Sequence, residues 1–151
     1  MMTSQEKKRI LKCYAQLDQR INELRDEIDI LWSRATSVTS TTTGFVRGGD
    51  GDGNKIERAY ERIEKVTNIL EQEIDKLLLL EHKITKAIQA LPDITERRIL
   101  MLAYIGKTVP SRSGKAVEHK RLSLFNIAKE LAYSYDRVKH IHGNALLHIE
   151  L

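Results

Sequence analysis

The sequence predicts an all-α protein, in which a long antiparallel helical hairpin of coiled-coil type precedes a three-helix domain. Three observations support this class. Two long stretches carry apolar residues at alternating spacings of four and three, the period of a helix seam. Only 2 of the 151 residues are proline. The end of the chain holds short amphipathic segments separated by polar corners. We expect residues 1–91 to form the hairpin and residues 92–151 the three-helix domain.

Cysteine usage and hydropathy indicate the compartment. The single cysteine, Cys13, allows no internal disulfide, which suits a reducing environment. The first residues are charged and contain no apolar run, so no signal peptide is predicted. The apolar run of residues 77–80 is far too short to span a bilayer. We therefore expect a cytoplasmic protein without a membrane partner.

The first expected helix covers residues 4 to about 34. Its apolar residues follow spacings of four and three without a break, as in the a/d seam of a coiled coil. Cys13 lies beside this seam, and we interpret it as a small packing residue because no partner base is suggested. We predict that the seam mediates oligomerisation through Ile10, Tyr14, Leu17, Ile21, Leu24, Ile28 and Leu31.

Residues 36–53 contain no hydrophobic period and consist largely of Ser, Thr, Gly and Asp, so we expect a flexible loop. One alternative is a calcium loop. Asp50, Asp52, Asn54 and Glu61 stand at positions 1, 3, 5 and 12 of an EF-hand pattern, but its sixth position, normally Gly, is Lys55. That substitution removes the sharp turn and adds a cation, so the flexible loop is favoured and no metal site is predicted.

The second expected helix begins near Asn54 and ends near Ala90, a length of about 55 Å. It carries a second seam of apolar residues: Ile56, Tyr60, Ile63, Leu70, Ile74, Leu77, Ile84, Ile88 and Leu91. A hairpin of two helices cannot cover a seam this wide, so we expect self-association, with a dimer as the simplest state. Docking of the hairpin onto the C-terminal domain is the alternative.

Pro92 marks the boundary between the two parts, because it disfavours helix at the residue before it. Asp93, with Glu96 three residues on, predicts a capped helix that runs to about Ile105. Residues 107–121 follow as a connector containing Pro, Gly, Ser and several basic residues. We expect this connector to be a loop.

Residues 124–147 predict two short helices joined by a tight corner, the arrangement of a helix-turn-helix unit. In the first, Leu124, Ile127, Ala128 and Leu131 share one face. Ser134 is suited to cap the second helix. The inward stripe expected for that second helix consists of Val138, Ile141, Ala145, Leu146 and Ile149.

The outward face of the last helix is polar and basic, as expected of a helix that enters the DNA major groove. Residues 94–151 hold 10 Lys and Arg against 5 Asp and Glu, whereas residues 1–93 hold 15 against 16. This asymmetry favours double-stranded DNA as the partner, although solubility would explain it equally well. The DNA-binding residues predicted on the helix are Tyr135, Asp136, Arg137, Lys139, His140, Gly143 and Asn144. In the connector, contacts to phosphates are predicted for Arg112, Lys115, Lys120 and Arg121.

The last 60 residues or so resemble region four of bacterial sigma factors. The resemblance rests on the segment LPDITERRILML, residues 91–102, followed by Ile127, Ala128, Leu131 and Ser134. The segment RVKHIHGNAL, residues 137–146, is similar to the version in small phage-encoded transcriptional regulators of the ArpU type. Two features depart from the pattern. Ala132 stands at the corner where Gly is usual, and the connector is longer.

The resemblance implies a sequence-specific DNA-binding transcriptional regulator of phage late genes, acting in the cytoplasm of a bacterial host cell. Two other functions stay open. One is a small terminase-like DNA-packaging protein, and the other is a sigma mimic that binds RNA polymerase through the hairpin. The sequence shows no metal-ligand cluster, paired carboxylates or nucleophile with a base, so we expect neither an enzyme nor a cofactor. His140 and His142 lie two residues apart on a helix, where their side chains diverge, so we do not expect them to bind a metal ion together.

Overall fold

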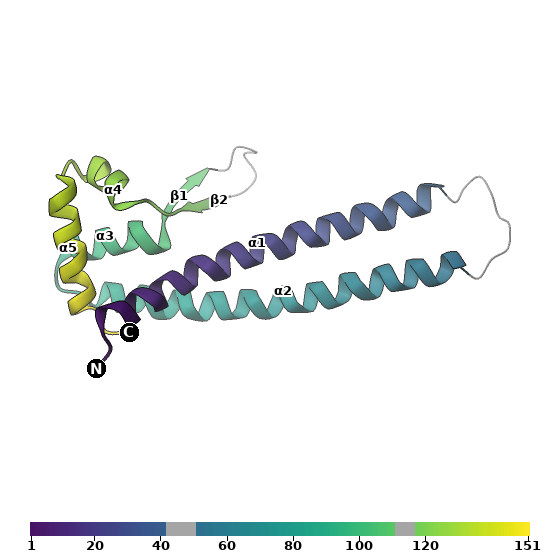
Figure 1. Ribbon diagram of the computed structural model, residues 1–151, viewed down its shortest axis with the longest axis horizontal. Helices are drawn as coiled ribbons and strands as arrows, with labels where there is room; N and C mark the ends of the chain where they lie inside the picture. The colour runs from purple at the N-terminus through teal and green to yellow at the C-terminus, as the bar shows by residue number, and fades with distance from the viewer. Residues whose placement is uncertain (42–50, 111–116) are drawn as a thin grey trace. The chain divides into compact units, whose positions relative to one another are not determined.

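The computed structural model describes residues 1–41, 51–110 and 117–151, and for residues 37–41, 51–54, 110 and 117–119 it describes the backbone alone (Figure 1). The long helices are α1 (Ser4–Thr41) and α2 (Gly51–Gln89). Then come helix α3 (Ile94–Leu100), π-helix η1 (Met101–Ile105), strands β1 (Lys107–Pro110) and β2 (Val117–Lys120), and helices α4 (Leu124–Leu131) and α5 (Tyr135–His148). The described residues are mostly helical, so the predicted all-α class is confirmed.

The two long helices extend further than the sequence predicted. α1 continues to Thr41 and α2 begins at Gly51, so the expected loop over residues 36–53 is wrong at both ends. Thr36 shows how a hydroxyl is accommodated in the helix, since its Oγ1 donates to the Trp32 carbonyl oxygen at 3.0 Å. Residues 42–50, with Asp50 of the near-calcium pattern, lie outside the described residues.

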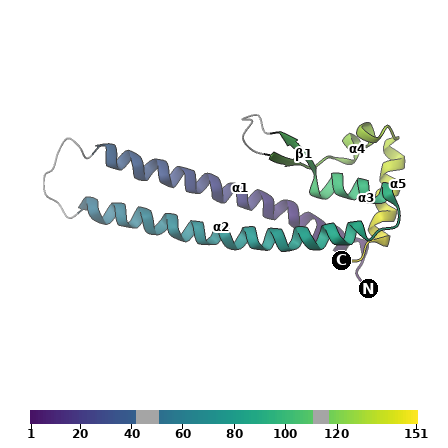
Figure 2. The same cartoon turned by 180° about the vertical axis from the view of Figure 1, so that it is seen from behind.

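The expected connector loop over residues 107–121 is also wrong in part, because its two ends form paired strands. β1 runs antiparallel to β2, with Lys107 opposite Lys120, and the two strands lie side by side in both views (Figures 1 and 2). Gly106 makes the close approach possible. It adopts φ +103°, and a Cβ there would stand 2.9 Å from the carbonyl carbon of Lys120. The predicted three-helix domain therefore contains a strand pair between its first two helices.

The chain divides into two compact units whose bounds differ from the predicted 1–91 and 92–151. Unit 1 comprises Met1–Gln16 with Leu77–Leu151, and unit 2 comprises Leu17–Lys76. In unit 2 the two helices touch through an edge-to-face contact of Trp32 with Tyr60, whose ring centroids are 5.7 Å apart. There, too, a guanidinium nitrogen of Arg62 lies 3.8 Å from a carboxylate oxygen of Glu27.

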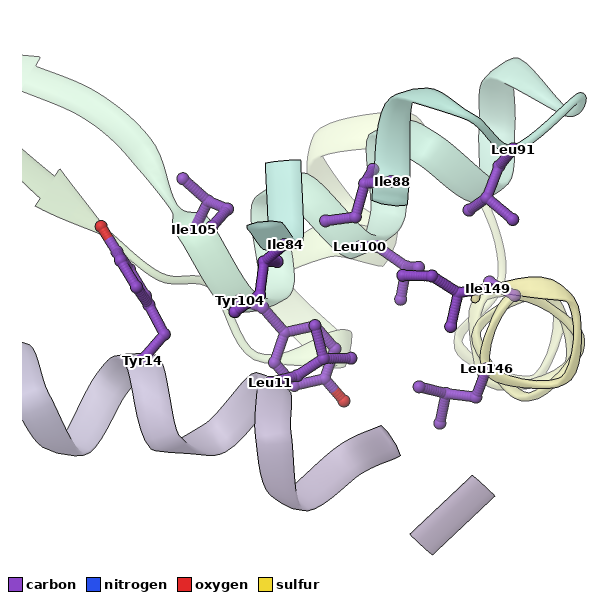
Figure 3. Packing of buried hydrophobic residues seen from close by; sticks show 11 residues of the cluster. Leu11, Tyr14, Ile84, Ile88, Leu91, Leu100, Tyr104, Ile105, Leu146 and Ile149 are labelled. Atoms are coloured by element: carbon purple, nitrogen blue, oxygen red, sulfur yellow. The ribbon is translucent and has the colours of Figure 1, made fainter. Parts of the chain in front are cut away.

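The larger hydrophobic core of unit 1 draws on helices far apart in the sequence (Figure 3). Leu11 and Tyr14 of α1 point toward the side chains of the other elements, Leu146 approaches from α5, and Ile149 approaches from the position directly after α5. The buried members are Leu11, Tyr14, Ile84, Ile88, Leu91, Leu100, Tyr104, Ile105, Ala145, Leu146 and Ile149. The start of α1 and the end of α2 therefore complete the core on which α5 packs. Leu11, which is fully buried, was absent from the predicted seam.

A second, smaller core joins α3, α4 and α5. Its buried members are Ile99, Ile127, Ala128 and Val138, one or two from each helix. Ile99, Ile127 and Val138 have no exposed surface. The backbone N–H of Leu122 donates to the Leu102 carbonyl oxygen at 2.9 Å and fixes the chain as it enters α4. Together these contacts set how α4 and α5 lie against α3.

The corner between α4 and α5 contains a residue in a left-handed conformation. Ala132 has φ 56° and ψ 38°, and its N–H caps α4 by donating to the carbonyl oxygens of Ala128 and Lys129. This conformation strains a residue that carries a Cβ, whereas glycine adopts it freely. A glycine would therefore suit the backbone at position 132 better than alanine does.

We expect Ala132→Gly to raise the free energy of unfolding by up to about 1 kcal/mol, because it relieves this strain and Ala132 is exposed. Urea unfolding measures the change. Ala15→Gly, placed inside α1, is the matched control and should destabilise by about 0.5–1 kcal/mol. Equal losses at both positions would show that the corner carries no strain.

Candidate nucleic-acid interface

Side-chain caps and a backbone turn define the corner between α4 and α5. Ser123 opens α4, its hydroxyl accepting from the N–H of Asn126. Ser134 opens α5 in the same way, accepting from the N–H of Arg137 at 3.2 Å. The N–H of Tyr133 donates to the Ala128 carbonyl oxygen at 3.0 Å, so a carbonyl group in the last turn of α4 is bonded from beyond the helix. Both helices thus have a serine as N-cap, and for α5 this is the residue that the sequence predicted, Ser134.

α5 has a buried face and an exposed face. Val138, Ala145, Leu146 and Ile149 are buried, and Ile141 is half-buried. The residues predicted to bind DNA lie on the other face: Tyr135, Asp136, Arg137, Lys139, His140 and Gly143 are exposed, and Asn144 is half-buried. A Cβ added to Gly143 would meet nothing within 4 Å, so the backbone of α5 is open to solvent at that point.

Cations lie close to aromatic rings on α4, on α5 and at the corner between them. The guanidinium carbon of Arg137 lies 4.3 Å from the centre of the Tyr133 ring, and Lys139 Nζ lies 5.6 Å from the centre of the Tyr135 ring. On α4, Lys129 Nζ lies 4.6 Å from the centre of the Phe125 ring. Each pair has the geometry of a cation–π contact.

Sequence reasoning missed Phe125 and Lys129. Phe125 is 56 % exposed and meets Tyr135, which is 46 % exposed, with ring centroids 6.4 Å apart and ring planes at 61°. The available signal was the helical period. Ile127 lies at the centre of the buried face of α4. Phe125 stands 200° around the helix axis from Ile127, so the helical period predicts that its side chain points outward.

The basic residues predicted in the connector have different surroundings. Lys120 is exposed, whereas Arg121 is half-buried and its guanidinium carbon lies 5.7 Å from the centre of the Tyr14 ring. Lys107 Nζ donates to Glu130 Oε1 at 2.6 Å, and this hydrogen bond lowers the pKa of the Glu130 carboxyl. Arg112 and Lys115 lie outside the residues that the structure describes.

No protein-family model, curated protein or solved structure matches this chain. Within residues 1–36, 55–109 and 120–151, whose side chains are described, no group of three or more His, Cys, Asp or Glu is placed to hold a metal ion. No helix in the described part of the chain is both long and apolar enough to span a membrane.

Two buried polar side chains anchor α5 to the rest of unit 1, and the sequence analysis anticipated neither pair. His142 Nε2 lies 2.8 Å from the hydroxyl oxygen of Tyr104, and both residues are buried. Buried Glu96 lies with its carboxylate oxygens 3.0 and 3.1 Å from Nδ1 of exposed His148. Of the predicted capping pair, Asp93 caps α3, because its side chain accepts from two N–H groups of that helix, whereas the carboxylate of Glu96 contacts His148 instead.

Burial shifts the pKa values of the first pair. Desolvation lowers the pKa of His142 below 6.5, and the charge of Lys8 lowers it further. Desolvation raises the pKa of Tyr104 to about 12. Both shifts favour the neutral forms, in which the Tyr104 hydroxyl donates to the imidazole or accepts from it.

We expect the free energy of unfolding to fall as the pH drops below 6.5, because the unfolded chain then binds the His142 proton more strongly than the folded chain. Above pH 6.5 this contribution is fully present. Urea unfolding between about pH 5 and 8 measures it. His142→Gln, which lacks the titrating group, should show a smaller loss on acidification. Identical pH profiles would contradict this assignment.

The predicted oligomerisation seam lies partly inside the single chain. Tyr14, Ile21 and Leu24 are buried, and Ile10, Leu17, Ile28 and Leu31 are half-buried. A second copy that bound through the buried part of this seam would have to displace contacts already made within the chain. Cys13 is exposed beside the seam.

Proposed function

We propose that this chain is a sequence-specific DNA-binding protein that controls transcription, with α4 and α5 acting as a helix-turn-helix unit. The observation that carries the proposal is the exposed polar and basic face at the start of α5, which lies opposite a buried stripe that is apolar except for His142. Ser134 caps the N-terminus of α5, so the side chains of the first turn of this helix can project into a DNA groove. The resemblance to small phage-encoded transcriptional regulators adds the proposal that the regulated genes are phage late genes.

The residues of this face suit distinct contacts. Arg137 and Lys139 can bind phosphates or guanine edges, and Asp136 can accept from the amino group of cytosine. Asn144 can pair with adenine or contact a phosphate. Gly143 would allow the backbone of α5 to approach DNA closely, because it leaves open space where another residue would place a side chain.

Oligomerisation through α1 and α2, as a dimer, remains part of the proposal. The contacts of Trp32 with Tyr60 and of Glu27 with Arg62 support an antiparallel helical hairpin. Two helix-turn-helix units held at a fixed spacing engage half-sites about one DNA turn apart. Such tethering raises apparent affinity by about 10²–10⁴ where both units can bind.

The test begins with selection of bound duplexes from a random pool by the full chain. We expect Arg137→Ala and Lys139→Ala each to weaken binding of the selected duplex by about 1–3 kcal/mol where a base contact is lost, as measured by fluorescence anisotropy. A residue that binds only phosphate should instead lower the salt slope by about one. Both side chains are exposed, so the fold should be retained.

Lys65→Ala is the matched control, since Lys65 is an exposed cation in unit 2. It should bind like the unchanged chain. Unchanged affinity in both α5 variants would exclude this face as the interface, and failure to select any sequence would reject sequence-specific binding itself.

A further inference from the structure

Two exposed aromatic side chains form a pair where α4 and α5 begin. Phe125 is the second residue of α4 and Tyr135 the first residue of α5, and their rings meet edge to face. More than half of Phe125 and nearly half of Tyr135 remain exposed to solvent. Their ring contact gives the unit a fixed apolar surface beside the polar face of α5.

An ammonium group lies over each ring of this pair. Lys129 covers Phe125 and Lys139 covers Tyr135, so the apolar surface is bounded by positive charge. The acidic groups nearby in sequence are Glu130, which is paired with Lys107, and Asp136. A partner that fits this surface presents an apolar group between anionic groups, as the major groove of DNA does between its phosphates.

Only one base-edge group in the major groove is apolar, the C5-methyl group of thymine. Stacking of a base on either ring would require that base to leave the duplex, whereas contact with a methyl group leaves the duplex intact. We infer that Phe125 and Tyr135 together contact thymine methyl groups, while Lys129 and Lys139 bind the flanking phosphates. This inference rests on the proposed function and assigns specificity to α4 as well as α5.

Replacement of thymine by deoxyuridine tests the inference, because it removes the methyl group and leaves base pairing unchanged. Each thymine of the selected duplex is replaced singly, and affinity for the full chain is measured by anisotropy. We expect one or two positions at which deoxyuridine weakens binding about fourfold, the effect of losing one buried methyl group.

Variants then locate the methyl contact. Phe125→Ala or Tyr135→Ala should weaken binding of the thymine duplex and abolish the difference between thymine and deoxyuridine at the sensitive positions. Phe125→Leu, which keeps an apolar side chain, should retain part of that difference. Lys129→Ala should weaken binding of both duplexes equally and lower the salt slope by about one. Circular dichroism checks that each variant stays folded.

The outcomes separate this inference from the proposed function. If the chain selects a sequence but no thymine position is sensitive, the inference fails and the proposed function stands. If both aromatic variants keep the full difference, the methyl contact is made elsewhere and the inference fails. Failure to select any sequence rejects the proposed function, and this inference with it.

Discussion

Truncation of the chain to residues 92–151 is expected to give a fragment without a cooperative unfolding transition. The cut removes five buried side chains of the larger core: Leu11, Tyr14, Ile84, Ile88 and Leu91. Each contributes about 1.5–3 kcal/mol on burial, so the combined loss reaches the whole stability of an ordinary domain, about 5–15 kcal/mol. Leu100, Leu146 and Ile149 would then be exposed to water.

The control keeps unit 1 and removes the rest. Replacement of residues 17–76 by a flexible Gly/Ser linker retains both segments of unit 1, Met1–Gln16 and Leu77–Leu151. This chain should unfold cooperatively in urea, with the near-ultraviolet circular dichroism of packed aromatic residues. If the fragment 92–151 unfolds at the same urea concentration as this control, the start of α1 and the end of α2 are dispensable for the C-terminal core.

Ile127→Ala is expected to destabilise the full chain by about 2–5 kcal/mol. Ile127 is fully buried in the smaller core, where it packs with Ile99 of α3 and Val138 of α5. Removal of its side chain leaves a cavity at the point where three helices meet. Chemical unfolding measures the loss, and a lower melting temperature should accompany it.

Ile94→Ala is the matched control for this substitution. Ile94 is the first residue of α3 and is 74 % exposed, so its truncation should change stability by less than about 0.5 kcal/mol. Equal effects of the two substitutions would mean that Ile127 is not packed between the helices. A large loss at Ile127 alone would fit the role of this core in holding α4 and α5 in a fixed orientation.

Local patterns in the sequence predicted the helices and one face of α5. The four and three spacing around Leu24 and Ile63 predicted the long helices, because a helical period is visible within a single segment. Asp93 and Ser134 cap α3 and α5, and a cap depends only on the next few N–H groups. The exposed residues at the start of α5 followed from the same period.

Contacts between distant segments decided the rest. Nothing local to residues 107–121 indicated that Lys107 would lie opposite Lys120, since strand pairing depends on both segments and on the close approach at Gly106. Equally, Leu11 belongs to the core of the C-terminal part only because the two ends of the chain pack together.

The buried polar pairs show the same division. The sequence placed His142 on α5, but its hydrogen bond to Tyr104, 38 residues away, exists only in the folded chain. The contact of Phe125 with Tyr135 likewise depends on the left-handed corner at Ala132, which brings the first turns of α4 and α5 together. Periodicity and caps are properties of one segment, and the sequence therefore determined them. The packing that assembles the cores and the candidate interface is a property of several segments, and only the tertiary structure decided it.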